Sequence, residues 1–189
     1  MKDIALLIID MQNDFVLPGA PQCVSGAVAV IPNIQKVLRL FRQNSLPVFH
    51  VVREYRADGI DIEIVRREGF LSGRPYCVPG TTGCDIVDGL TPADGEYRVV
   101  KNRFSGFMQT ELDFMLRRLG VSMIVVCGIQ YPNCIRATIF DGVSYGYDVT
   151  LVTDATGAQT KEIADANIRD IANIGVSCMT ADDFIRLMN

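Results

Sequence analysis

The segment Ile4–Asp10, with the sequence IALLIID, decides the fold: six consecutive apolar residues end on a single carboxylate. So short an apolar run predicts a β-strand that is covered on both faces, which is typical of parallel sheets. Similar short runs recur along the chain, separated by longer segments with apolar residues at helical spacing. This alternation predicts an α/β fold with three layers, in which a six-stranded parallel, Rossmann-like sheet lies between helices.

The expected elements follow from this periodicity. The strands are predicted at Ile4–Asp10, Pro47–Arg53, Tyr97–Lys101, Met123–Gly128, Asp148–Thr153 and Val176–Met179. The helices are predicted at Ala27–Asn44, Thr110–Leu119, Cys134–Tyr145, Lys161–Ile174 and Ala181–Met188. Between Arg53 and Tyr97 the pattern lapses into a long irregular stretch with several Pro and Gly turns, and an ordered loop of this length is usually functional or lies at an interface.

Length and composition limit the classes of protein to which this chain can belong. A chain of 189 residues, with 49% hydrophobic and 21% charged residues, is expected to form one globular domain over residues 1–189. Its formal net charge of −4 makes nucleic acid and anionic membranes poor partners. Six cysteines without a C-x-x-C pair are expected to be reduced thiols, and no apolar leader precedes the first strand, so we expect a cytoplasmic protein.

Three reactive side chains are expected at one edge of the sheet, because ligands of open parallel sheets bind beyond the carboxyl ends of the strands. Asp10 ends the first strand, Lys101 ends the third, and Cys134 follows the fourth and opens a helix. A helix N-terminus and a nearby ammonium lower the pKa of a cysteine, and an aspartate can accept its proton. Each residue alone is more often structural than catalytic, so only their shared position favours a catalytic site.

Three ordered blocks carry a family resemblance. They are ALLIIDMQNDF at residues 5–15, KNRFSGF at residues 101–107 with Thr110, Leu112 and Asp113, and GIQYPNCIRAT at residues 128–138. Here the chain resembles the isochorismatase-like cysteine hydrolases, which include nicotinamidases, N-carbamoylsarcosine amidases and ureidoacrylate or biuret amidohydrolases. The resemblance implies strand order 3-2-1-4-5-6, with Asp10 as base, Lys101 as its electrostatic partner and Cys134 as nucleophile.

The resemblance also implies features around the nucleophile. A cis peptide between Ile129 and Gln130 would let the backbone N–H groups of Gln130 and Cys134 form an oxyanion hole. Phe15 matches an aromatic residue of the family pocket. Gln130 and Tyr131 stand where the family commonly has Ala and Thr, so Tyr131 is expected at the mouth of the pocket, in contact with substrate.

The irregular region adds three arginines, Arg53, Arg56 and Arg74. A guanidinium there could bind a substrate carboxylate or ureido oxygen, and Arg53 is the one predicted to bind substrate. Surface or subunit-interface salt bridges are the alternative.

No metal and no other cofactor are expected. Nicotinamidases hold a metal through an Asp-x-His pair after the second strand and another histidine, whereas the only histidine here is His50, inside the second predicted strand. A buried histidine with one satisfied ring nitrogen is the expectation for His50, and nicotinamidase activity is not expected.

The sequence therefore predicts a cysteine-dependent hydrolase of a small amide, ureide or N-carbamoyl compound, acting through a thioester. The alternatives are hydrolysis of a vinyl ether such as isochorismate, and a non-catalytic binding protein on the same fold. One difficulty is that the strand of Lys101 lies two strands, or about 10 Å, from that of Asp10. A homo-oligomer, either a dimer or a tetramer, is also expected, as is common in the family.

Overall fold

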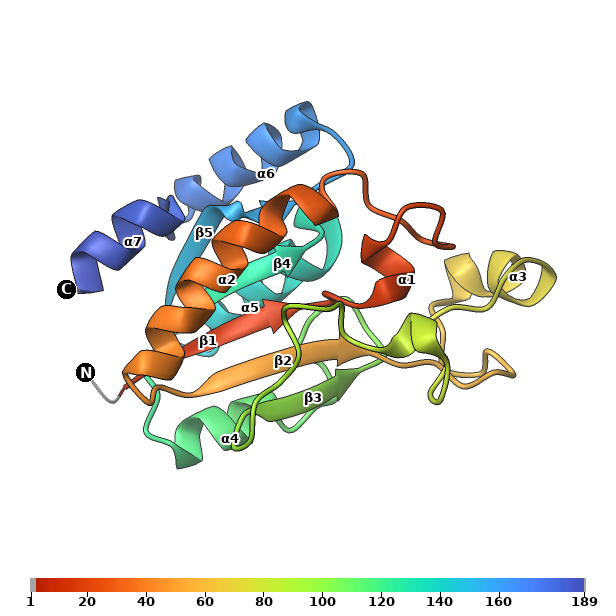
Figure 1. Cartoon of the computed structure of the whole chain (residues 1–189), viewed down its shortest axis with the longest axis horizontal. Coiled ribbons are helices and arrows are strands. Elements are labelled where there is room, and N and C mark those ends of the chain that lie inside the picture. The colour runs from red at the N-terminus through yellow and green to blue at the C-terminus, as the bar shows by residue number, and fades with distance from the viewer. Residues whose placement is uncertain (1–2, 189) are drawn as a thin grey trace.

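The computed structural model describes residues 3–188, and its core is a six-stranded sheet with every adjacent pair of strands parallel (Figure 1). The strand order is β3-β2-β1-β4-β5-β6. The strands are β1 (Ile4–Ile9), β2 (Val48–Arg53), β3 (Tyr97–Lys101), β4 (Met123–Ile129), β5 (Asp148–Gly157) and β6 (Ser177–Met179). The α/β class and the strand order are confirmed.

Helices cover both faces of the sheet. They are α1 (Asn13–Val16), α2 (Ala27–Gln43), α3 (Ile64–Ser72), α4 (Leu112–Arg118), α5 (Arg136–Ser144), α6 (Lys161–Asn173) and α7 (Ala181–Met188), with shorter turns η1 (Thr82–Cys84) and η2 (Tyr131–Ile135). Buried residues of α2 and α7 pack in one cluster, and those of α4, α5 and α6 pack in another. The predicted three-layer arrangement is therefore present, with α3 projecting beyond the carboxyl ends of the strands (Figure 1).

The central strand β1 shows why the sheet holds together. All six of its residues are buried, with Leu6 and Ile8 packed on the α2 side and Leu7 and Ile9 on the opposite side. Full burial of such a side chain stabilises the fold by about 1.5–3 kcal/mol. Both faces of β1 are thus covered, and its end has a fixed place in the molecule.

Several segments differ from the sequence prediction. Strand β5 continues to Gly157, because the register with β4 shifts between Val126 and Gly128 and pairing resumes beyond the shift. The helix expected to begin at Cys134 begins at Arg136, after the π-helical turn η2. The stretch between β2 and β3 contains α3 and η1.

No helix among residues 3–188 is both long enough and apolar enough to span a bilayer.

Candidate active site

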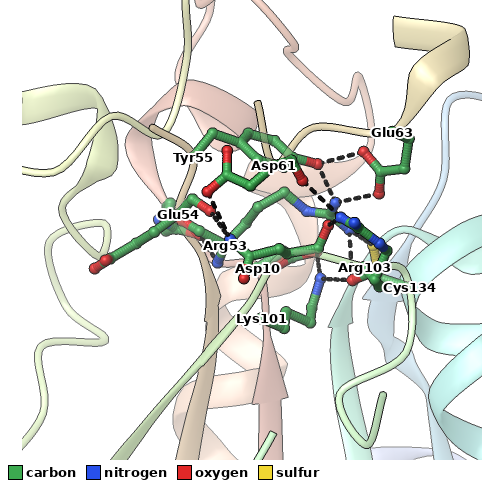
Figure 2. Close-up of polar contacts among 11 residues, drawn as sticks. Asp10, Arg53, Glu54, Tyr55, Asp61, Glu63, Lys101, Arg103 and Cys134 are labelled. Atoms are coloured by element: carbon green, nitrogen blue, oxygen red, sulfur yellow. Dashed lines mark hydrogen bonds and ion pairs between the residues drawn. The ribbon is translucent and has the colours of Figure 1, made fainter. Parts of the chain in front are cut away.

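Four side chains converge where the parallel strands end (Figure 2). Asp10 directly follows β1, Arg53 ends β2 and Lys101 ends β3, while Cys134 lies in η2 directly beyond β4. Asp10 has a φ of +53°, in the left-handed region that residues other than glycine rarely adopt, and its N–H donates to the Val51 carbonyl at 2.9 Å. Unusual backbone of this kind clusters at functional sites.

Lys101 and Asp10 form a buried ion pair. Lys101 Nζ lies 2.8 Å from Asp10 Oδ2, and the two side chains are 0% and 4% exposed. The lysine side chain crosses beyond the end of β2, which is how it covers the two-strand separation. Within the described residues 3–188, Asp10 Oδ1 is buried and has no hydrogen-bond partner. The aspartate therefore keeps one oxygen free to accept a proton.

The Cys134 thiol is buried beside Arg53. Arg53 Nη2 lies 3.1 Å from Cys134 Sγ. Burial raises the pKa of this thiol and the Asp10 charge raises it further, while Lys101 and Arg53 lower it by less. The expected lowering of the Cys134 pKa was wrong, because burial and the Asp10 carboxylate together outweigh the two cations. The resting group is thus a thiol, and a reaction at Cys134 needs a proton acceptor.

Arg53 is held by a network from the segment after β2. Its Nη1 contacts the Tyr55 hydroxyl and lies 2.6 Å from Glu63 Oε1, and its Nη2 donates to the Arg103 carbonyl at 3.1 Å. The Tyr55 hydroxyl donates to Glu63 Oε2 at 2.5 Å. Burial opposes the charge of Arg53, but Cys134, Asp10, Tyr55 and Glu63 together hold its pKa well above the ordinary value. Arg53 is a fixed cation.

A narrow pocket with a cavity volume of about 20 Å³ opens onto these groups. Its lining includes Asp10, Phe15, Val24, Arg53, Arg66, Ile129, Gln130, Asn133 and Cys134. Two segments far apart in sequence, the turn after β4 and the helix α3, therefore contribute to one pocket.

The residues predicted to bind substrate divide into two groups. Phe15 and Arg53 line the pocket, whereas Tyr131 does not. Tyr131 is fully buried in the core, and its hydroxyl donates to the Thr153 carbonyl at 2.9 Å. A large ring with one polar atom gains most from burial with that atom paired, which is why Tyr131 lies away from the mouth of the pocket.

Gln130 lines the pocket, and its peptide bond to Ile129 is cis in the structure. The Gln130 carbonyl accepts hydrogen bonds from Asn133 and Ile135 N–H groups, but within residues 3–188 its own backbone N–H donates none. That N–H is available to a bound molecule.

The other two arginines lie elsewhere. Arg56 is exposed and its Nε lies 3.7 Å from Asp58 Oδ1. Arg74 lies beside the Gly19 carbonyl, at a different surface hollow. Neither lines the pocket.

Arg66, Asn133 and Val24 were missed by sequence reasoning. Arg66 belongs to α3, which was not predicted because it buries a single residue, Phe70. The spacing of Glu63, Arg66 and Phe70 at three and four residues is the signal that could have placed them on one helical face.

The residues present do not form a metal site of the nicotinamidase type. His50 is buried within β2, and its Nε2 lies 2.9 Å from Glu96 Oε2. No group of three or more His, Cys, Asp or Glu side chains in residues 3–188 is arranged to hold a metal ion.

Comparison with known proteins places this geometry in context. The Isochorismatase domain model matches residues 4–183. An Arabidopsis thaliana protein named a probable inactive nicotinamidase is 44% identical over 186 residues, covering 97% of this chain and 95% of that protein. The ureidoacrylate amidohydrolase RutB of Caulobacter vibrioides is 30% identical, covering 82% and 77%. The crystal structure of an isochorismatase family protein from Desulfovibrio vulgaris has a TM-score of 0.95 and 50% identity, covering 98% of each chain.

Proposed function

Because this chain belongs to the isochorismatase family, we propose that it is a cysteine-dependent hydrolase of a small amide, ureide or N-carbamoyl compound. The observation that carries the proposal is a buried thiol, Cys134, that shares a small pocket with the Asp10–Lys101 ion pair. The relative named for ureidoacrylate hydrolysis supports the substrate class.

The reaction begins with a proton transfer. The free oxygen of Asp10 takes the Cys134 proton, and the thiolate attacks the carbonyl carbon of the substrate. Arg53, at 3.1 Å from Sγ, stabilises the thiolate as it forms. Both terminal nitrogens of its guanidinium are already occupied by Glu63, Tyr55 and the Arg103 carbonyl, and within residues 3–188 only the buried Nε lacks a partner, so we assign Arg53 to the thiol in preference to the substrate.

The tetrahedral intermediate then collapses to a thioester. The backbone N–H groups of Gln130 and Cys134 hold the oxyanion, and ammonia or an amine leaves with the proton from Asp10. Water gives a proton to Asp10 and attacks the thioester, and the acid product leaves as the Cys134 thiol is restored. Lys101 holds Asp10 in place through both half-reactions.

Nicotinamide is not the favoured substrate, because the only histidine lies inside the sheet against Glu96. The Arabidopsis relative is itself named a probable inactive nicotinamidase. A homo-oligomer stays a prediction, as do a cytoplasmic location and a single domain.

The test is ammonia release from a panel of small amides, ureides and N-carbamoyl acids, with nicotinamide included. We expect release by the wild type and a loss of at least about a thousandfold in Cys134→Ala, since the nucleophile is absent. Cys178→Ala is the matched control, because that half-buried thiol does not line the pocket and its loss leaves the rate unchanged. Equal rates in wild type and Cys134→Ala would contradict the proposal. Turnover of isochorismate by both proteins would favour vinyl ether hydrolysis.

A further inference from the structure

The charges that line the pocket do not cancel. Lys101 is paired with Asp10, and Arg53 is paired with Glu63. The remaining charged side chain of the pocket lining is Arg66, from the first turn of α3. Arg66 makes no ion pair with any carboxylate of residues 3–188, so the pocket has one uncompensated positive charge in a protein whose net charge is negative.

The surroundings of Arg66 hold its guanidinium in place. Its Cζ lies 4.9 Å from the centroid of the Phe104 ring, and Arg53 Cζ lies 5.6 Å from the same centroid. Packing against a ring orients the guanidinium, and the Tyr76 hydroxyl accepts a hydrogen bond from it, so a ligand would bind its remaining donors. Its titratable neighbour is Tyr76, a neutral hydroxyl whose pKa is raised by burial and lowered, to a lesser extent, by Arg66.

The helix that supplies Arg66 is tied to the reacting thiol. Glu63 precedes α3 directly and holds Arg53, whose other nitrogen touches Cys134. The backbone N–H of Arg66 donates to the Glu63 carbonyl at 2.8 Å. Arg66 therefore lies on the wall of the pocket that holds Cys134, on a helix whose start is tied to the thiol through Glu63 and Arg53.

We propose that Arg66 binds a carboxylate of the substrate, so that the preferred substrates are small acids that carry their amide or carbamoyl group a few atoms from the carboxylate. This inference rests on the proposed function, because it takes the carbonyl carbon to lie at Cys134. A planar guanidinium with free edge donors matches a carboxylate with two parallel hydrogen bonds. An uncharged amide of the same shape gains much less binding free energy from the guanidinium.

The experiment measures protection of the Cys134 thiol from iodoacetamide, read by mass spectrometry of its peptide. The probes are N-carbamoylglycine and the neutral N-carbamoylglycinamide, matched in size. In the wild type we expect half-protection at a concentration of the acid about tenfold below that of the amide, as one charge-assisted bond predicts. Ammonia released in the same mixtures corrects for any probe consumed.

Variants then test whether Arg66 is the residue responsible for the preference for the acid. Arg66→Gln is expected to abolish it, while Arg66→Lys keeps a part, because an ammonium retains the charge but not the paired donors. Arg67→Gln is the matched control: it removes the same charge from the next residue of α3, whose exposed side chain bonds the Gly59 carbonyl and does not line the pocket. It is expected to behave as the wild type.

Three results would overturn the inference: no protection by the acid, equal protection by acid and amide in the wild type, or a preference that survives Arg66→Gln. The proposed function fails separately. Protection by the acid without ammonia release from any compound would support the carboxylate site and reject hydrolysis. Ammonia release without any preference for acids would support hydrolysis and reject the carboxylate site.

Discussion

At the scale of single residues, the chemistry of Cys134 is set by three charges and by burial. The Asp10 carboxylate opposes the thiolate, and Lys101 and Arg53 favour it. Because burial is the largest contribution and raises the pKa, the thiol keeps its proton until a base removes it. The arrangement suits a nucleophile that is activated by proton transfer to Asp10 more than one that rests as a thiolate.

Asp10→Asn separates two roles of the aspartate: its negative charge opposes the thiolate, and its carboxylate accepts the thiol proton. Removing its charge leaves Lys101 and Arg53 facing the thiol, so we expect the pKa of Cys134 to fall and alkylation by iodoacetamide at pH 7 to become faster. Hydrolysis should be lost, since no base remains. The measurement is the pH profile of alkylation beside ammonia release. Circular dichroism checks that the variant folds with Lys101 unpaired, and an alkylation profile moved to higher pH would contradict this account.

At the scale of elements, the contact between β1 and β4 fixes the distance from Asp10 to the turn that holds Cys134. Gly128 in β4 is paired with Ile9 and has a φ of +110°. A Cβ at this position would lie 2.2 Å from the Ile9 carbonyl oxygen. No side chain fits there, and the two strand ends can approach only because the residue is glycine.

Gly128→Ala is expected to cost about 3 kcal/mol or more in the free energy of unfolding, because a backbone atom cannot move aside as a side chain can. Gly120→Ala is the matched control. Its φ is also positive, at +70°, but its Cβ would meet no atom within 4 Å, so about 1–2 kcal/mol of backbone strain is expected. Urea denaturation of both variants measures the difference, and equal losses would show that the contact with Ile9 is unimportant.

The segment between β2 and β3 shows where prediction from sequence ends at this scale. A functional or interfacial role was expected for it from length alone; Arg66 from this segment lines the pocket, and Glu63 holds the lining residue Arg53. Helix α3 was missed because Ile64 and Val65, which are 86% and 84% exposed, remove the apolar periodicity that marks a buried face.

At the scale of the whole molecule, a second buried cluster governs stability in acid. His50 of β2 contacts Glu96, the residue before β3, and Arg42 Nε lies 2.6 Å from the same carboxylate. Burial opposes the charge of Glu96, but hydrogen bonds from Arg42, Ala93 N–H and His50 lower its pKa to about 2. Burial also lowers the pKa of His50 from its ordinary 6.5, despite the nearby Glu96.

Both shifts have the same sign for stability. When the pKa of a group is lower in the folded protein than in the unfolded chain, the unfolded chain binds more protons than the folded protein at pH values between the two. Each group therefore stabilises the folded protein above its unfolded pKa, and this stabilisation is lost as the pH falls. We expect the free energy of unfolding to decrease first below about pH 6.5 and again between about 4.5 and 2. Glu96→Gln should flatten the second decrease, whereas the exposed Glu111→Gln should not. Urea titrations across this range test it, and an unchanged acid slope would contradict it.

The sequence by itself determined the strands, their order through the family resemblance, and the placement of Asp10, Lys101 and Cys134 at one edge. These follow from local patterns, since apolar runs set strands and parallel strands end together. The tertiary structure alone decided the raised pKa of Cys134, the burial of Tyr131, and the pairing that leaves Arg66 free. The partners in these contacts lie far apart in sequence, 81 residues for Arg53 and Cys134 and 91 for Asp10 and Lys101. Desolvation and charge pairing depend on what folding brings together, which no local pattern records.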